Sequence, residues 1–226
     1  MKVIKIIIQI DNKYKLILNI FENKNEVIQD TSNFDYSSPA PNKKGGDKIK
    51  KVNKMFNELM IKAINEFREN PTKLVPAIKE IIPFLRKPSE SKIVVEKEGC
   101  PKVVLIKGES LILECIDIIS KLEELPKFEY KKELEIKIPK DKDFISVQQE
   151  LFEYKKNELK DKYDYFAYHY DIGISSPDYS LLFQIIDDNV LSGIRRANLI
   201  NRKLKYIAVS HKLINKKFYS CFMFAG

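Results

Sequence analysis

Glycine and proline are scarce in this sequence, at 7 and 10 of 226 residues. This scarcity excludes collagen-like and Gly/Ser-linker proteins. Hydrophobic residues make up 44% of the chain and charged residues 32%, which excludes a wholly disordered protein. A chain of this length buries roughly 70% of its unfolded surface. We therefore expect a self-sufficient hydrophobic core that needs neither disulfides nor metals.

Long apolar runs are also missing. No stretch approaches the roughly 18 consecutive apolar residues of a membrane-spanning helix. The apolar N-terminal run is interrupted by Lys2, Lys5 and Gln9, so it lacks the continuous apolar segment of a signal peptide. We expect no membrane span, and we interpret the N-terminal run as a β-strand.

Cysteine and histidine are too few and too scattered for a metal site. Cys100, Cys115 and Cys221 have no Cys-x-x-Cys spacing and lie in apolar surroundings, which is typical of free thiols in a reducing compartment. His169 and His211 have no cysteine or second histidine at ligand spacing, so there is no zinc signature. We interpret both as surface or turn residues. The sequence predicts no cofactor and a cytoplasmic location.

Arginine is scarce as well, although the formal net charge is +8. Arginine is the residue that contacts phosphate and guanine bidentately. Lysine supplies most of the positive charge and alternates with glutamate, as in Lys131-Lys132-Glu133. That pattern favours a solvated basic surface over a nucleic-acid interface.

No catalytic motif is complete. Gly108-Glu109-Ser110 begins like a nucleophile elbow but lacks the second glycine of that turn. We interpret Ser110 as a helix cap instead. A hydrolase would therefore have no identifiable active site in this sequence. The sequence predicts that the chain is not an enzyme.

The chain divides into three segments. Residues 2–10 and 14–21 are β-prone runs around a turn, which predicts an N-terminal hairpin extension over residues 1–22. Residues 23–51 are polar and contain serine, proline, lysine and glycine clusters typical of a linker or surface loop. Residues 52–226 carry the remaining elements and form the predicted main domain.

The main domain is predicted to be α+β. Apolar residues from Val52 to Phe67 recur at helical spacing, which predicts a core-facing helix that ends at Asn70-Pro71. Ser176-Pro177 predicts another helix start. Further helices are expected from Pro76, from Ser110 and over 147–160, the last one exposed; strands are expected over 206–209 and 218–224. This order suggests an antiparallel or mixed sheet between helical layers.

An aromatic run at residues 163–170 predicts a partner surface. It exceeds what a solvated loop needs, and tyrosine and phenylalanine are enriched in interface cores. It lacks the basic residues of a base-stacking platform. The candidate surface consists of Tyr163, Tyr165, Phe166, Tyr168 and Tyr170.

The most informative window is residues 185–200, IIDDNVLSGIRRANLI, followed by YIAVSH at 206–211 and CFMFAG at 221–226. It resembles the C-terminal half of the CAP family, also called SCP-like proteins. Members carry a helix ending in an Ile-Ile-Asp-Asp-Gly-Val-like sequence, a Gly-His-Arg turn, an Asn-Ile/Leu segment and a strand ending in Phe-Ala. Arg68-Glu69-Asn70-Pro71 is similar to the end of the family's first helix. The resemblance covers residues 52–226 and implies a three-layer α-β-α sandwich.

The family's cleft holds a divalent metal with two histidines and two acidic residues. The resemblance places Ile118 and Ile194 at the histidine positions, Asp171 at one acidic position, and Asp187 or Asp188 at the other. Isoleucine has no ligand atom. The resemblance therefore implies a degenerate cleft without a tight zinc site.

A CAP-like fold without the histidines of the metal-binding cleft predicts a non-catalytic structural or scaffold subunit of a larger protein assembly. The narrower prediction is a cytoskeletal or ciliary assembly, with the hairpin and the aromatic run contacting protein partners. The alternative is a module that binds lipid or another apolar ligand, because the family is associated with such ligands and isoleucines make the cleft more apolar.

Overall fold

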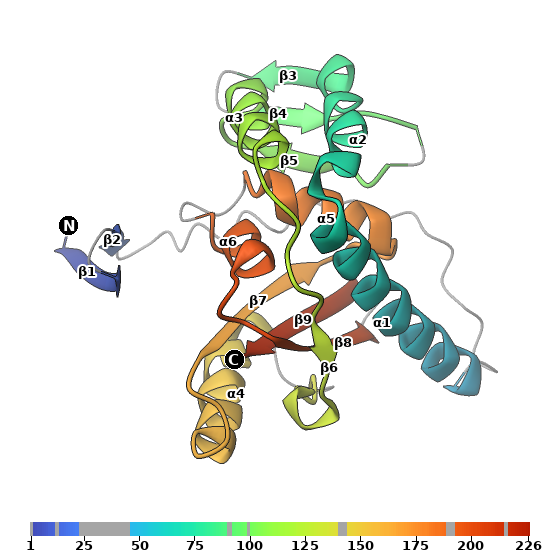
Figure 1. The fold of residues 1–226 in the computed structure, drawn as a ribbon. Helices are drawn as coiled ribbons and strands as arrows, with labels where there is room; N and C mark the ends of the chain where they lie inside the picture. Colours follow the sequence, from blue (N-terminus) through green and yellow to red (C-terminus); the bar gives the residue numbers. More distant parts are fainter. Residues whose placement is uncertain are drawn as a thin grey trace.

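The computed structural model describes residues 2–11, 14–22, 46–89, 92–98, 100–139, 144–188, 193–214 and 217–226. Helices and strands are mixed along the chain (Figure 1), which confirms the predicted α+β class. The described helices include none that is both long and apolar enough to cross a membrane.

The main sheet has four strands in the order β6-β8-β9-β7. β8 (Tyr206–Ile214) and β9 (Lys217–Ala225) form an antiparallel pair, which confirms and lengthens both predicted strands. β7 (Phe166–Ile172) pairs with the other edge of β9 and is also antiparallel. The two-residue β6 (Glu129–Tyr130) is parallel to the start of β8, so the sheet is mixed.

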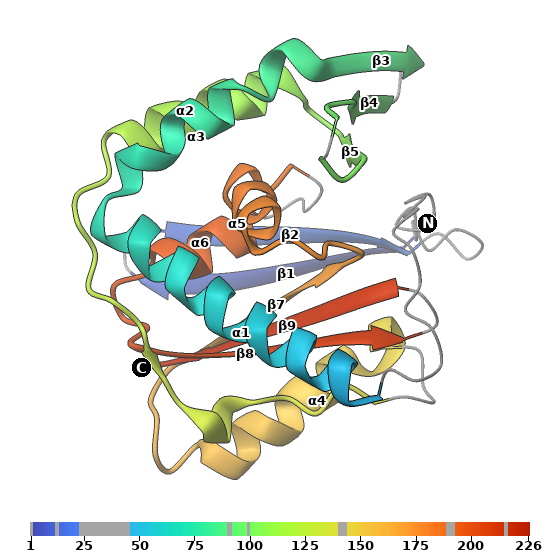
Figure 2. The same cartoon turned by 90° about the vertical axis from the view of Figure 1, so that its right-hand side faces the viewer.

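Helices pack on both faces of this sheet (Figure 2). Side chains of β8 and β9 alternate between two cores because successive residues of a strand point to opposite faces. Core 1, with α1, α3, α5 and α6, receives Ile207, Val209, Phe222 and Phe224. Core 2, with α4, receives Ala208, Cys221, Met223 and Ala225. This double coverage explains why β9 is apolar almost throughout.

The long helix α1 (Gly46–Glu69) spans one face of the sheet. Phe56, Met60, Ile64 and Phe67 of its apolar stripe are at most 4% exposed and share core 1 with β9, as the sequence predicts. Met55 and Leu59, in the same predicted core-facing run, are instead 52% and 44% exposed. The helix begins at Gly46, so residues 46–51 are helical and the linker predicted over 23–51 is wrong there. Residues 23–45 lie outside the described residues.

A second, three-stranded sheet was missed by the sequence analysis. It is antiparallel, in the order β3 (Leu85–Ser89), β4 (Lys92–Val95), β5 (Val103–Leu105). It lies beside α2 (Val75–Lys79) and α3 (Glu109–Ser120), as Figure 1 shows. The short helices η1 (Pro71–Leu74) and η2 (Ile82–Phe84) flank α2 along the chain, whereas η3 (Lys132–Leu134) packs against β8 and β9 of the main sheet.

The predicted cap of α3 is wrong. The N-cap is Gly108, with φ of 63°, and a Cβ atom there would come within 2.5 Å of Ile93 Cδ1. Glycine therefore fits both the left-handed backbone and the close approach. Ser110 lies inside the first turn, where its Oγ donates to Lys107 O at 3.2 Å.

The remaining helices are α4 (Phe144–Leu159), α5 (Pro177–Ile186) and α6 (Ile194–Ile200). Ser176 caps α5 as predicted, because its Oγ accepts from Tyr179 N–H at 3.5 Å. The helix predicted over 147–160 exists as α4 but is not simply exposed, since Phe152 and Leu159 are buried in core 2.

The N-terminal hairpin is confirmed as β1 (Lys2–Asp11) and β2 (Tyr14–Glu22), paired antiparallel from Lys2 opposite Glu22. Its turn residues 12–13 lie outside the described residues. In strand pairing it forms a separate two-stranded sheet.

Candidate functional site

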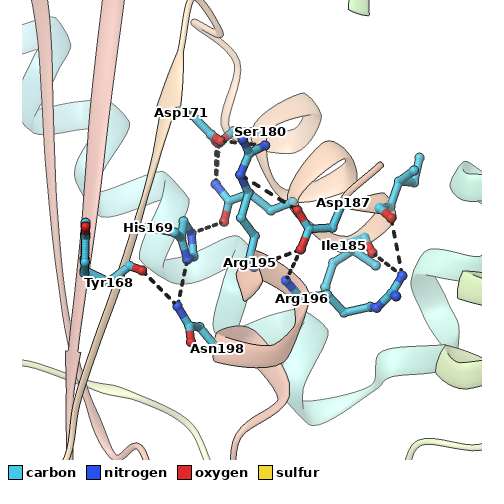
Figure 3. Close-up of polar contacts among 11 residues, drawn as sticks. Tyr168, His169, Asp171, Ser180, Ile185, Asp187, Arg195, Arg196 and Asn198 are labelled. Atoms are coloured by element: carbon cyan, nitrogen blue, oxygen red, sulfur yellow. Dashed lines mark hydrogen bonds and ion pairs between the residues drawn. The ribbon is translucent and has the colours of Figure 1, made fainter. Parts of the chain in front are cut away.

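Two of the predicted cleft carboxylates lie in one buried polar cluster between β7, α5 and α6 (Figure 3). Asp171 is on β7, and Asp187 follows the last residue of α5. Arg195 of α6 lies between them, with Nη1 3.4 Å from Asp171 Oδ1 and Nε 3.9 Å from Asp187 Oδ1. The two carboxylates therefore share one internal cation.

Asp171 is further stabilised by hydrogen bonds to its second oxygen. Ser180 Oγ and Gln184 Nε2 both donate to Asp171 Oδ2 at 2.6 Å. Both residues are on α5, one turn apart and fully buried. Asp171 is only 4% exposed, so solvent contributes little to its stabilisation.

His169, on β7 as well, belongs to the same cluster. Its Nε2 lies 2.9 Å from Gln184 Oε1, and its Nδ1 lies 3.4 Å from Asn198 Nδ2. These partners suit a neutral ring that donates from Nε2 and accepts at Nδ1. The ring stacks on Phe222, with centroids 4.7 Å apart. Burial lowers the pKa of His169 to about 4.

Asp187 connects the end of α5 to the start of α6. Its backbone is left-handed, with φ of 53°, a conformation that non-glycine residues adopt rarely. Its Oδ2 accepts from the N–H groups of Arg195 at 2.8 Å and Arg196 at 3.2 Å, where the dipole of α6 favours a negative charge. Burial raises the pKa of this carboxyl, while Arg195 acts in the opposite direction.

Asp188 is separate from this cluster. Its carboxylate accepts from the N–H groups of Lys107 and Gly108 at 2.7–3.0 Å. It therefore holds the turn between β5 and α3 against the end of α5. Of the two acidic positions left open by the sequence, Asp187 is the one that lies beside Asp171 and Arg195.

The two predicted isoleucine positions differ in their surroundings. Ile118 of α3 is half-buried against core 1, and Ile194 at the start of α6 is 36% exposed. Within the described parts of the chain, no group of three His, Cys, Asp or Glu side chains is placed to hold a metal ion.

The sequence analysis missed most partners of the two carboxylates. It assigned His169 to a surface or turn, whereas the ring is 3% exposed. It gave no role to Gln184 or Asn198. The available signal was the spacing of Ser180 and Gln184, two polar residues one turn apart with only apolar residues between them.

The predicted aromatic partner surface is largely an intramolecular packing layer. Tyr168 stacks on Phe152 of α4 with centroids 4.1 Å apart. The other contacts are edge-on or tilted: Tyr170 with Phe144 at 5.9 Å, Tyr163 with Phe166 at 6.0 Å and with Tyr206 at 5.3 Å. Tyr163 is buried, the other three of these rings are partly buried, and Tyr165 is 48% exposed. These rings therefore also serve packing within the chain, and their role in partner contacts stays a prediction.

The three cysteines are free thiols in the structure, and Cys115 and Cys221 are buried. Burial raises the pKa of Cys221 to about 12 and that of Cys100 to about 11. Such thiols stay protonated at neutral pH, so none is suited to act as a nucleophile.

The second histidine is also buried. His211 of β8 stacks between Phe56 and Phe218, at 3.7 and 5.1 Å, and its Nδ1 lies 2.7 Å from Ser220 Oγ. Burial lowers its pKa to about 3. Both histidines are therefore neutral in the folded chain at pH 5, and their assignment to a surface or turn is wrong.

Acidification is expected to destabilise the chain through these histidines. In the unfolded chain each binds a proton below pH 6.5, whereas in the folded chain each does so only near pH 3 or 4. The unfolded state thus binds more protons, so the free energy of unfolding falls between pH 7 and pH 5, by about 2 kcal/mol per histidine. Urea denaturation at both pH values measures the change.

The matched variant for this measurement is His211→Phe, which keeps a ring between Phe56 and Phe218. Its stability should fall less between pH 7 and pH 5 than that of the natural chain. Asp187 acts in the opposite sense, because its raised pKa favours the folded state at lower pH. An equal pH dependence of the two chains would contradict the assignment for His211.

No family model matches the chain, and neither a curated protein nor a solved structure shows significant similarity to it.

Proposed function

We propose that this chain is a non-catalytic structural or scaffold subunit of a larger intracellular protein assembly. The observation that carries the proposal is the position of Arg195 between Asp171 and Asp187. A guanidinium supplies the positive charge that a metal ion supplies in a metal-binding cleft. Two carboxylates already compensated from within the chain have little charge left to attract a cation.

The state of His169 supports the same proposal. Both ring nitrogens have partners inside the chain, and the ring is 3% exposed. A general base must be within hydrogen-bond reach of the proton that it removes. A substrate would have to displace Gln184 or Asn198 to reach this ring, so the cluster is better suited to holding β7, α5 and α6 together.

The proposed fold is a degenerate CAP-like α-β-α sandwich. It is supported by the helices on both faces of the four-stranded sheet and by the proximity of Asp171 and Asp187. In such a fold the original cleft would be the place now filled by Arg195 and its partners. The function then depends on surfaces outside the cleft, and the hairpin is the segment that we propose for partner contacts.

Deleting residues 1–22 is expected to abolish co-purification of protein partners at low salt. A two-stranded hairpin is marginal alone and needs another surface to cover it. The core residues that the structure describes lie between Phe56 and Ala225, so the shortened chain should remain folded by circular dichroism. Tyr154→Ser, at a ring that is 72% exposed on α4, is the control and should retain the partners.

Unchanged co-purification of the shortened chain, or loss of its fold, contradicts the proposal. Native mass spectrometry of the purified natural chain distinguishes the alternative function. A stoichiometric lipid retained by the protein would favour an apolar-ligand module over a scaffold.

A further inference from the structure

The four-stranded sheet has two edges, and they differ in how they are covered. At the β7 edge, Asn198 Nδ2 of α6 donates to Tyr168 O at 3.2 Å. At the other edge, β6 pairs only with Tyr206 and Ile207 of β8. Among the described residues, no strand pairs with this edge of β8 beyond Ile207. Unpaired edges are places where further strands add.

The pairing of β8 with the end of β6 shows which backbone groups of β8 point away from β9. Lys131 N–H donates to Ile207 O at 3.1 Å, so Ile207 directs its carbonyl to the outer edge. Backbone groups alternate in direction along an antiparallel strand. The N–H and C=O groups of Val209, His211 and Leu213 therefore face the outer edge as well, and those of the intervening residues face β9.

A groove follows this free edge. It has a volume of about 220 Å³ and is lined by Asn57 of α1, by residues 135–138 and by Ser210 and His211 of β8. The wall on the α4 side is fixed, because Ile136 N–H donates to Ser210 Oγ at 3.1 Å and Lys212 Nζ donates to Ile138 O at 2.5 Å. The opposite wall is α1, whose Phe56 stacks on His211.

One side-chain oxygen of α1 in this groove has no hydrogen-bond donor. Asn57 Oδ1 is buried without one, as is Asn53 Oδ1 one helical turn earlier. Asn57 belongs to the groove lining. A buried acceptor without a donor costs about 1–3 kcal/mol. The Asn57 oxygen, in a groove also lined by Ser210 and His211 of β8, would be satisfied by a segment that brings a donor into the groove.

The N-terminal hairpin is a segment that needs such a site. Its register pairs Ile4 with Ile20, Ile6 with Leu18 and Ile8 with Leu16. Alone in water, a two-stranded sheet is marginal. Docking on β8 gives it a third strand and a neighbouring helix.

The connection between the hairpin and α1 is long enough to reach the groove. Residues 23–45 join Glu22 to Gly46, the first residue of α1. Along the helix, Asn57 is ~17 Å from Gly46 at 1.5 Å per residue, whereas residues 23–45 span up to ~75 Å when extended. Such a tether reaches the groove and holds the hairpin at a high effective concentration.

We propose that the β1–β2 hairpin adds to the free edge of β8 within the same chain (in cis), at the groove lined by α1 and residues 135–138. The main sheet then grows from four to six strands, and the outer strand of the hairpin becomes its open edge. This inference concerns the fold of a single chain and goes beyond the proposed function, although it explains why the hairpin would present a strand to partners.

Amide hydrogen exchange of the isolated chain, followed residue by residue by NMR, tests the proposal. The N–H groups of Val209, His211 and Leu213 should exchange at least tenfold more slowly in the full chain than in a chain without residues 1–22. The intervening amides bond to β9 and should change little. Equal exchange at the three outward amides in both chains overturns the proposal.

A second variant keeps the test independent of the deletion. Asn57→Arg places a long charged side chain in the groove and should speed exchange at the same three amides. Glu58→Arg, on the solvent side of α1 with its side chain 67% exposed, is the matched control and should not. Protection that increases with protein concentration would overturn docking in cis in favour of a second copy. The exchange experiment uses the isolated chain without protein partners. Its outcome is therefore independent of the co-purification experiment that tests the proposed function.

Discussion

Replacing Arg68 by methionine is expected to lower the free energy of unfolding by about 4 kcal/mol. Arg68 is fully buried although it lies in the last turn of α1. Its Nε donates to Pro126 O at 2.5 Å and its Nη1 to Leu199 O at 2.7 Å. The guanidinium also lies 3.8 Å from the centre of the Phe128 ring. Methionine fills similar space but leaves these carbonyls without donors.

The charge of Arg68 persists at neutral pH although burial lowers its pKa to about 10. Charged donors make stronger hydrogen bonds than neutral ones, and a cation at the last carbonyls of α6 is favoured by the helix dipole. Arg68→Lys keeps the charge but loses the planar fork that reaches several carbonyls at once. We therefore expect Arg68→Lys to lower the free energy of unfolding, but by less than Arg68→Met does.

Urea denaturation measures these losses, and Arg86→Met is the control. Arg86 is exposed, and its Nη1 donates to the nearby carbonyls of Pro83 and Leu85, so its replacement should cost less than 1 kcal/mol. A loss below 1 kcal/mol for Arg68→Met as well would show that the buried guanidinium does not hold α1, residues 126–128 and α6 together.

Much of the fold was predictable because local patterns decided it. The apolar residues from Phe56 to Phe67 recur with the period of an α-helix. The strand β9, which packs against this helix, carries apolar residues on both faces. The capping Ser176 with Pro177 is a local signal too. In each case the residues that determine the element are close together in the sequence.

The missed elements depend on distant contacts. β7 looks like an exposed aromatic run until α4 supplies Phe144 and Phe152 against its tyrosines. The strands β3 to β5 are short, and β3 contains Arg86, Lys87 and Pro88, so its composition resembles a loop. A single sequence does not show which segment will cover such residues.

The candidate site was predictable only in its carboxylates. The resemblance to the CAP family pointed to Asp171 and Asp187, but their partners lie on α5 and α6 and meet them only in the folded chain. Arg195 was visible in the sequence only as the neighbour of Ile194, where the resemblance expects a histidine. Its reach to both carboxylates depends on the left-handed turn at Asp187 and on the placement of α6 beside β7.

Replacing Arg195 by methionine is expected to lower the free energy of unfolding at pH 7 by about 3–5 kcal/mol. The side chains of Asp171 and Asp187 are 3% and 0% exposed, so water cannot replace the lost cation. The matched control is Arg202→Met. Its ion pair with Glu123 is largely exposed, at 54% and 89%, and its loss should cost less than 1 kcal/mol.

The pH dependence separates lost charge compensation from lost packing. Without Arg195 the pKa of Asp187, already raised by burial, should rise further. The folded variant then takes up a proton before the unfolded one, so its deficit relative to the natural chain shrinks as the pH falls from 7 toward 4. A second variant that adds Asp171→Asn and Asp187→Asn removes both charges and should recover part of the stability at pH 7. A deficit that is equal at both pH values, with no recovery in the triple variant, would show that Arg195 contributes packing alone and would remove the main support for an internally compensated, non-catalytic cleft.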